Sequence, residues 1–433
     1  MSLVAPVEEL KPVEARAIVE SLRRGTVPID HVPYFTVGRE RWLSIIEDDL
    51  ANYIAAGGAK VRFLSGDYGD GKTHFLSVIQ HLVQQEKFAV SFVVLTREVP
   101  MHKFELVYQE IVSRLVTRPG TAGLRVLLAH WLETLQPQLS ALDEATRTVR
   151  LQEIAETVKS LPGMDINFAQ GLISLVQQRY LPLAEDDTSE ARDTAQELLY
   201  QWFEGARLSK SELRPFQIFE SLNKHNSKRL LLSLIAFLRH LGYQGLILLL
   251  DELETVMAQS ASVRNAAYEN VRLLIDNAEQ AHHLHVFFSI IPDVILAEKG
   301  FKSYDALWSR VRSVGESRRL NYRSIVIDLH RTPLEPAELI ELGKRLRYIH
   351  ELAYRWEAAG IVTNDFIAQV CATQQRMGLV AEVRLYIKQI IRYLDMAEQE
   401  GTLAGVDLVD QAVATQREIA TGQDTAHRPT WDA

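Results

Sequence analysis

The stretch VRFLSGDYGDGKTHFLSVIQ, residues 61–80, decides the fold class of this chain. A short apolar run at 61–66 predicts a buried strand, and the pattern from 72 to 86 predicts a helix. Between them, residues 66–73 read GDYGDGKT and match the phosphate-binding pattern G-x-x-x-x-G-K-[ST]. A strand, a glycine-rich turn and a helix in this order form the start of a parallel α/β sheet.

The residue types in this loop suit a bound triphosphate. Glycine lets the backbone wrap closely, so that N–H groups point at phosphate oxygens, and the helix adds its positive N-terminal end. Lys72 is expected to bridge the β- and γ-phosphates, and the Thr73 hydroxyl to ligate Mg²⁺. We therefore predict a site for ATP and Mg²⁺. Its cofactor-binding residues are Gly66, Asp67, Tyr68, Gly69, Asp70, Gly71, Lys72, Thr73 and His74.

A second apolar run, GLILLLDE at 245–252, predicts a strand that is buried on both faces and ends in two carboxylates. Asp251 is expected to help hold Mg²⁺, the role of the acidic Walker-B residue in P-loop NTPases. Glu252 is expected to polarise the attacking water as a general base. Carboxylates also favour helix N-termini, so the pair points to catalysis only because a phosphate-binding loop accompanies it.

Further strands are predicted at 88–96, 283–293 and 324–330, which makes the fold class α/β with a parallel sheet. Residues 100–240 carry Leu, Gln, Glu, Ala and Arg at helical spacing, and we expect a helical insertion there rather than a continuation of the sheet. The predicted divisions are N-terminal helices and a loop at 1–60, a core at 61–99 and 241–332, the insertion at 100–240, a helical lid at 333–400 and a polar tail at 401–433.

The composition is that of a soluble globular protein, with 433 residues, 47% of them hydrophobic and 24% charged. No apolar run reaches the roughly 18 residues needed to cross a bilayer, and no signal peptide is visible, so we expect a cytoplasmic protein without a membrane partner. The single cysteine, Cys371, excludes an intramolecular disulfide and a cysteine-cluster zinc site. A net charge of −9 disfavours a uniformly basic nucleic-acid-coating protein but leaves a local DNA-binding surface open.

Together these motifs resemble those of AAA+ ATPases, and the resemblance implies further site residues. TVGRE at 36–40 is similar to the GR box that many such NTPases place beside the adenine, which points to Val37, Gly38 and Arg39. Ser289, in FFSIIPD, stands where the next strand of AAA+ proteins carries a polar sensor of the γ-phosphate. Asp293 is the competing candidate for that role.

Arginines form another group of candidates. Arg384 stands early in a helix of the expected lid, where AAA+ proteins place a sensor arginine, with Arg376 and Arg392 as rivals. The stretch SRVRSVGESRRLNYR at 309–323 could supply an arginine finger to a neighbouring subunit or contact DNA phosphates, and a solvated basic face is the alternative. The finger candidates are Arg310 and Arg312, followed in the same stretch by Arg318, Arg319 and Arg323.

Two longer stretches narrow the resemblance, NSKRLLLSLIAFLRHLGYQGLILLLDELE at 226–254 and RNAAYENVRLLID at 264–276. With the phosphate-binding loop and the helical insertion, they make the chain similar to the ATP-binding proteins of BREX phage-defence systems, of the compact BrxD-like kind, across most of residues 14–395. The resemblance implies a role in bacterial antiviral defence beside a helicase, a DNA methyltransferase and other system proteins.

Two functions fit these motifs. ATP hydrolysis could drive remodelling of, or movement on, DNA–protein complexes, or ATP binding could switch a scaffold that recruits partners while hydrolysis stays slow. A STAND-like signalling NTPase is a further alternative. Because AAA+ sites commonly need an arginine from a neighbour, the resemblance also implies a nucleotide-dependent homo-oligomer.

Overall fold

The structure is a computed structural model that describes residues 5–118, 121–181, 188–276, 282–312, 320–377 and 382–409. The chain divides into two compact units, each built from separate segments of the sequence. Unit 1 consists of Met1–Leu43, Ser65–His81 and Asp328–Ala433, and unit 2 of Ser44–Leu64 and Leu82–Ile327.

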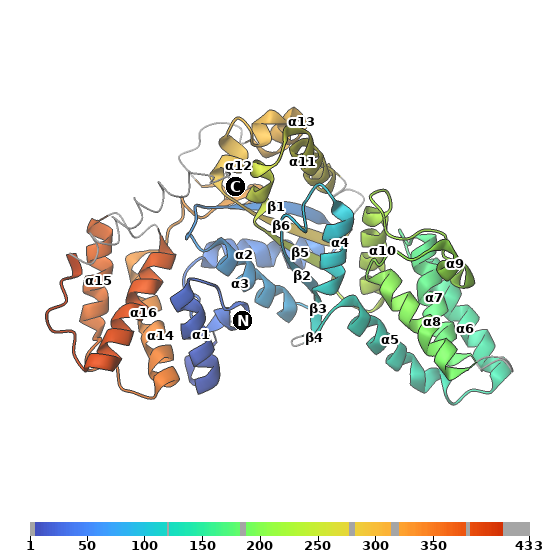
Figure 1. Cartoon of the computed structure of the whole chain (residues 1–433), viewed down its shortest axis with the longest axis horizontal. Helices are drawn as coiled ribbons and strands as arrows, with labels where there is room; N and C mark the ends of the chain where they lie inside the picture. Colours follow the sequence, from blue (N-terminus) through green and yellow to red (C-terminus); the bar gives the residue numbers. More distant parts are fainter. Residues whose placement is uncertain are drawn as a thin grey trace, which may run out of the picture. The chain divides into compact units, whose positions relative to one another are not determined.

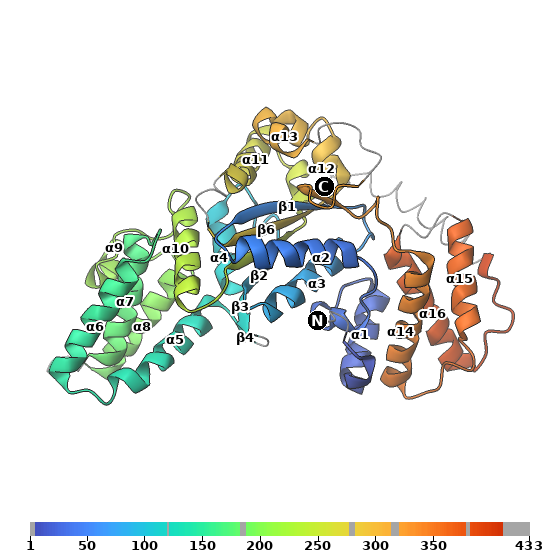
Figure 2. The same ribbon diagram turned by 180° about the vertical axis from the view of Figure 1, so that it is seen from behind.

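The sheet confirms the predicted α/β class, since it has seven strands in the order β4-β3-β2-β5-β6-β1-β7 and is mostly parallel. Figure 2 shows β1, β6, β2, β3 and β4 of this sheet. β2 pairs in parallel with β5, and β5 in parallel with β6. The strands are β1 (Ala59–Ser65), β2 (Ala89–Val94), β3 (Leu115–Arg118), β4 (Thr121–Ala122), β5 (Leu246–Asp251), β6 (Leu284–Ile290) and β7 (Val326–Asp328).

The two central strands are buried along their whole length. Every residue of β5 (LILLLD) and of β6 (LHVFFSI) is buried. Successive side chains of a strand point to opposite faces, so both faces of these strands must be covered, as the continuous apolar run of β5 predicts. In the parallel register Leu250 lies opposite Phe288. The next residues of the two strands, Asp251 and Ser289, are polar and are therefore neighbours across the sheet.

Residues 100–240 are mainly helical, but they also extend the sheet, so the expectation of no further strands there is wrong. β3 pairs antiparallel with β2, and β4 pairs antiparallel with β3. Strands of two to four residues are too short to show the alternation that reveals a strand in sequence. The helices of this segment are α4 (Phe104–Ser113), α5 (Leu124–Leu139), α6 (Glu144–Lys159), α7 (Ile166–Tyr180), α8 (Ser189–Phe203), α9 (Lys210–Leu213) and α10 (Ser227–His240).

One apolar core runs from the sheet into these helices. Buried residues of β5 and β6 belong to the same hydrophobic cluster as buried residues of α4, α5, α7 and α10. Figure 1 shows α6, α7 and α8 side by side within this helical part. Because the helices share their core with the sheet, the segment 100–240 is part of unit 2 and not an independently packed module.

Unit 1 is mainly helical, and its helices α1, α14 and α16 pack against one another (Figure 1). α1 ends at Gly25, whose φ of +77° is the left-handed conformation typical of a glycine that closes a helix. The segment 333–400, expected as a lid, contains helices, while most of the expected polar tail lies outside the described residues. The helices are α1 (Pro12–Arg24), α3 (Lys72–Gln85, shared with unit 2), α14 (Pro336–Tyr354), α15 (Asn364–Arg376) and α16 (Val383–Glu400).

The remaining helices are short or connect strands of the sheet. Among the described residues, no helix is both long and apolar enough to cross a membrane. The remaining helices include α2 (Glu40–Asp49), the π-helical turn η3 (Leu50–Ile54), the 3₁₀ helix η5 (Leu253–Ala258), α11 (Ala261–Asp276), α12 (Pro292–Leu296) and α13 (Asp305–Val311).

Candidate nucleotide-binding site

The predicted phosphate-binding loop lies between β1 and α3, in the context that the motif requires. Lys72 is the first residue of α3, and its ammonium group donates to the carbonyl oxygens of Gly66 at 2.8 Å and Asp67 at 3.2 Å. Lys72 is only 8% exposed. Its charge is therefore turned inward over the loop, where phosphate oxygens can replace the two carbonyls as acceptors.

The buried side chain of Asp70 forms a hydrogen bond within the loop. Its Oδ2 accepts a hydrogen bond from the backbone N–H of Asp67 at 2.7 Å, and the residue is 6% exposed. Burial raises the pKa of Asp70, while the bond from the Asp67 backbone and the charges of His330 and Lys72 oppose that rise. A side chain of the loop therefore helps to stabilise the conformation of the loop backbone.

His330, which the sequence reasoning missed, stands beside both acids of the loop. Its Nδ1 lies 3.5 Å from the carboxylate of Asp67 and 3.9 Å from that of Asp70. Donor atoms of these three side chains all lie within 4.8 Å of one another, so they could hold a cation. This cluster is distinct from the predicted Mg²⁺ ligands, Thr73 and Asp251.

His74, near the start of α3, contacts the segment that precedes the GR turn. Its Nε2 lies 3.2 Å from Thr36 Oγ1, and its ring packs against Phe35 at 5.2 Å between centroids. Thr36 Oγ1 already donates to the carbonyl of Val32, so His74 Nε2–H is the donor in this pair. Burial, helped by the nearby charge of Arg39, lowers the pKa of His74 to about 4, which leaves the ring neutral at pH 7.

The GR turn is tightly packed against α14. Gly38 and Arg39 both have left-handed backbones, with φ of +67° and +69°. A Cβ on Gly38 would lie 2.6 Å from Oε1 of Glu338, so a larger residue would have to displace that side chain, and the positive φ also favours glycine. Arg39 and Trp42 both donate to Thr332 Oγ1 at 3.1 Å, which anchors the turn to the segment after β7. A lone threonine carries no signal of this role in the sequence. Val37, the remaining residue predicted for the adenine side, is partly buried.

Of the three arginine candidates in the expected lid, Arg384 contacts the phosphate-binding loop. Arg384 is the second residue of α16, and its backbone N–H donates to the carbonyl of Gly69 at 3.3 Å. Glu382, just before it, lies close to Gly69 as well, and burial together with the Asp70 carboxylate raises its pKa. Arg384 is thus held beside the loop by its backbone, with an exposed side chain.

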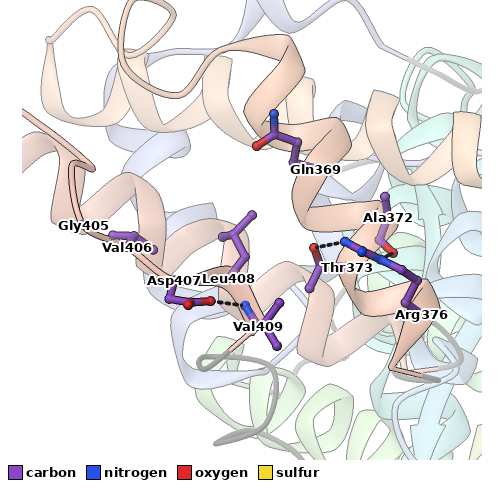
Figure 3. A pocket seen from close by; sticks show the side chains of 9 residues that line it. All are labelled: Gln369, Ala372, Thr373, Arg376, Gly405, Val406, Asp407, Leu408 and Val409. Atoms are coloured by element: carbon purple, nitrogen blue, oxygen red, sulfur yellow. Dashed lines mark hydrogen bonds between the residues drawn. The ribbon is translucent and has the colours of Figure 1, made fainter.

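The rival arginines have other surroundings. Arg376, near the end of α15, donates to Thr373 Oγ1 at 3.2 Å and to the carbonyl of Ala372 at 3.4 Å. It lines a pocket of about 510 Å³ between α15 and residues 405–409 (Figure 3). Arg392 lies further along α16 with an exposed side chain.

In unit 2, the structure brings three predicted residues together at the ends of β5 and β6. Asp251 is the last residue of β5 and is 3% exposed. Ser289 on β6 donates its hydroxyl hydrogen to Asp251 Oδ1 and accepts a hydrogen bond from the backbone N–H of Glu252 at 2.9 Å. The competing candidate, Asp293, is an exposed residue of α12.

The backbone of Glu252 is strained. Its φ of +64° and ψ of +39° lie in the left-handed region, which a residue other than Gly, Asn or Asp seldom adopts. Such residues persist where the surroundings hold them, and they cluster at functional sites. Here the N–H of Glu252 is held by Ser289, and its carbonyl accepts from Thr255 Oγ1 at 2.9 Å.

The arginines predicted as finger candidates lie in and after α13. Arg310 donates to both carboxylate oxygens of Asp276, the last residue of α11, with a distance of 2.8 Å between Nη2 and Oδ2. Arg312 is exposed at the end of α13, and Arg323 donates to Asp48 at 2.9 Å. Arg318 and Arg319 lie outside the described residues. Arg310 would have to leave Asp276 to reach a neighbouring subunit.

The α/β sheet and the loop with its inward-turned lysine define a P-loop nucleotide-binding protein. More narrowly, the chain belongs to the family of BREX system ATP-binding proteins BrxC/D, whose model matches residues 10–411. It is thus an ATP-binding component of a phage-defence system, with other components of that system as partners. The family expected from the sequence is confirmed. No curated protein and no solved structure matches the chain.

Proposed function

We propose that this chain is an AAA+-type ATPase that hydrolyses ATP in BREX phage defence and uses the energy to remodel or move on DNA–protein complexes. The family supports ATP binding and the defence role. The sheet order supports a hydrolytic core, because β6 with Ser289 lies between β5, which ends in Asp251, and β1, which leads to the P-loop.

The observation that carries hydrolysis is the strained turn at Glu252. A scaffold that only binds ATP needs ligands for phosphate and Mg²⁺ but no base. A left-handed backbone at a glutamate costs about 1–2 kcal/mol, which a fold keeps only where it gains something in return. Because Ser289 and Thr255 together hold this turn, we infer that the position of the Glu252 carboxylate matters for catalysis.

The residues divide the chemistry among them. Lys72 and the loop amides hold the phosphates. Thr73 and Asp251 would hold a bound Mg²⁺, which would supply positive charge beside the phosphates. Glu252 accepts a proton from the water whose oxygen attacks the γ-phosphorus. The bond to the β–γ bridging oxygen breaks, and ADP and phosphate leave.

The remaining predicted residues complete the proposal. The adenine side of the nucleotide is contacted by Val37, Gly38, Arg39 and His74. Arg384, at the start of α16, senses whether the γ-phosphate is present. Arg310 or Arg312 serves the site of a neighbouring subunit, which makes the active form a nucleotide-dependent homo-oligomer. A helicase and a DNA methyltransferase of the same system are the proposed partners.

The test measures ATP turnover with and without double- and single-stranded DNA, at constant low salt. We expect DNA to raise turnover several-fold in the wild type, and Glu252→Gln to remove turnover both with and without DNA. The matched control is Asp293→Asn, which neutralises the exposed carboxylate after β6 and should leave turnover unchanged.

The second candidate function, an ATP-switched scaffold, predicts a different result. Turnover would then be slow or absent despite tight ATP binding, and DNA would not change it. That result would contradict a DNA-dependent remodeller.

A further inference from the structure

The surroundings of Ser289 are not those expected of a γ-phosphate sensor, the role that its position in the sequence suggested. Its side chain is 0% exposed, and its hydroxyl has two partners within the turn that follows β5. The hydroxyl hydrogen goes to Asp251 Oδ1, and the oxygen accepts the N–H of Glu252. A serine hydroxyl carries a single hydrogen, so donating to a phosphate or to the attacking water would require releasing Asp251.

We propose that Ser289 is a positioning residue that locks the Asp251–Glu252 turn and does not read the nucleotide itself. The inference rests on the proposed ATPase function, because it explains how the base of that reaction is held. It concerns Asp251 and Glu252 together, since one hydroxyl bonds the side chain of the first and the backbone of the second.

The hydrogen bond that Ser289 donates to Asp251 belongs to a strong class. A hydroxyl that donates to a buried carboxylate makes a charge-assisted hydrogen bond, about twice as strong as a bond between neutral groups. Asp251 Oδ1 also lies 3.1 Å from the backbone nitrogen of Glu252, which donates to it. The carboxylate of the predicted Mg²⁺ ligand is therefore fixed in orientation from the side of the turn.

The bond to Glu252 holds the strained backbone. Without Ser289, the N–H of Glu252 loses its shorter hydrogen bond, at 2.9 Å, and its second acceptor, Asp251 Oδ1 at 3.1 Å, loses the hydroxyl that orients it. The residue can then relax toward the unstrained region with negative φ. Such a rotation would swing the Glu252 carboxylate away from its present position. A sensor serine would instead act through contact with the γ-phosphate, which ATP has and ADP lacks.

The chain offers a matched control in Ser91. Ser91 lies on β2, which pairs with the other side of β5, and it is also 0% exposed. Its hydroxyl donates to the backbone carbonyl of Ile111 at 3.0 Å, a contact that serves the fold alone. Ser91→Ala therefore reproduces the loss of a buried strand hydroxyl without touching the turn.

The first experiment separates positioning from sensing by kinetics and binding. We expect Ser289→Ala to lower kcat by about 10- to 100-fold, as removal of a supporting hydrogen bond typically does. The ratio of ADP to ATP dissociation constants should stay within about twofold of the wild-type ratio, because Ser289 does not contact the γ-phosphate. Ser289→Thr keeps the hydroxyl on a residue that suits a strand, so it should restore most of kcat, and Ser91→Ala should change neither quantity.

The second experiment needs no hydrolysis. Amide hydrogen exchange in the nucleotide-free protein should be faster at Glu252 in Ser289→Ala than in the wild type, and unchanged in Ser91→Ala. A variant that exchanges at the wild-type rate would overturn the positioning role, as would one that loses its preference for ATP over ADP. If the wild type hydrolyses no ATP, the proposed function fails, while the exchange rates still decide whether Ser289 holds the turn.

Discussion

Three neighbouring side chains of the P-loop segment show how local surroundings set the state of each residue. Lys72 is directed by two carbonyls of its own loop, and Asp70 by the amide of Asp67. His74 is neutral because burial removes water from its ring. The motif identifies the loop, and these contacts show which of its own groups stabilise its conformation.

The neutral state of His74 predicts a loss of stability in acid. Its folded pKa of about 4 lies below its ordinary value of 6.5, so the unfolded chain binds the proton first as the pH falls. The stabilisation that the neutral His74 ring contributes is fully present above pH 6.5 and is lost progressively toward pH 4. We expect the wild type to lose about 1–3 kcal/mol of unfolding free energy through this residue between pH 7.5 and 4.5.

Chemical denaturation at several pH values measures this effect in the wild type and in His74→Asn. The variant should have a flatter pH dependence over that range, and exposed His225→Asn should follow the wild type. Parallel curves for His74→Asn and the wild type would show that His74 is not the titrating group.

At the scale of elements, the GR turn depends on the fit of Gly38 against α14. Gly38→Ala places a Cβ 2.6 Å from Glu338 Oε1 at a φ of +67°, and we expect it to cost about 2–4 kcal/mol of unfolding free energy and to weaken ATP binding. Gly401, after α16, has a φ of +68° and nothing within 4 Å of such a Cβ. Gly401→Ala should therefore cost only about 1 kcal/mol.

Denaturant unfolding and ATP titration of the two alanine variants check the prediction. Equal costs in both variants would mean that backbone strain, and not contact with Glu338, limits position 38.

A partly buried polar network joins α1, α14 and α16. Trp356 Nε1–H donates to His350 Nδ1 at 2.9 Å, so His350 carries its proton on Nε2 and donates to Asp395 Oδ1 at 3.0 Å. Arg23 of α1 donates to both oxygens of the same carboxylate, at 2.6 and 3.0 Å. These bonds hold the pKa of Asp395 low against the opposing effect of burial.

Removal of Asp395 should loosen α16, the helix that carries Arg384. We expect Asp395→Ala to cost about 2–4 kcal/mol, because His350 is fully buried and would lose its acceptor. Affinity for ATP should fall as well, since α16 begins beside Gly69. Glu398→Ala on the exposed side of the same helix is the control in unfolding and ATP-binding measurements, and an equal effect there would refute the role of the network.

The elements that sequence reasoning found are those with a strong local signal. Strand β5 is a continuous apolar run and β6 is largely apolar, and the polar residues near their ends, Asp251 and Ser289, were predicted as site residues. The contacts of Thr332 and His330 could not be found, because each joins segments some 260 to 290 residues apart. β3 and β4 are too short to have a period, so the sheet edge was missed.

For the whole molecule, the sequence indicated the family and the α/β class, but not how the chain divides. Two units built from interleaved segments cannot be inferred from composition, because no linker-like stretch marks their boundaries. The shared core of the sheet and the helices at 104–240 likewise depends on contacts between distant residues. Arg312 is exposed, and Arg310 is bound to Asp276. Whether either arginine acts as a finger depends on a neighbouring subunit, so this role stays a prediction about assembly.

We expect ATP to promote assembly of the chain into a homo-oligomer. Light scattering coupled to gel filtration should show a larger species for Glu252→Gln with ATP and Mg²⁺, since this variant binds the nucleotide but does not consume it. Lys72→Ala should remain at the wild-type nucleotide-free size. A monomer in every condition would contradict the proposal that a neighbour completes the site.

The most direct test of hydrolysis at the P-loop and the acidic pair is steady-state phosphate release, measured beside ATP binding in the wild type, Lys72→Ala and Glu252→Gln. We expect the wild type to turn over ATP, Lys72→Ala to bind it weakly, and Glu252→Gln to bind it normally but to hydrolyse it at least about 100-fold more slowly. Wild-type protein that binds ATP without releasing phosphate, or Glu252→Gln with wild-type turnover, would refute hydrolysis by Glu252 at this site.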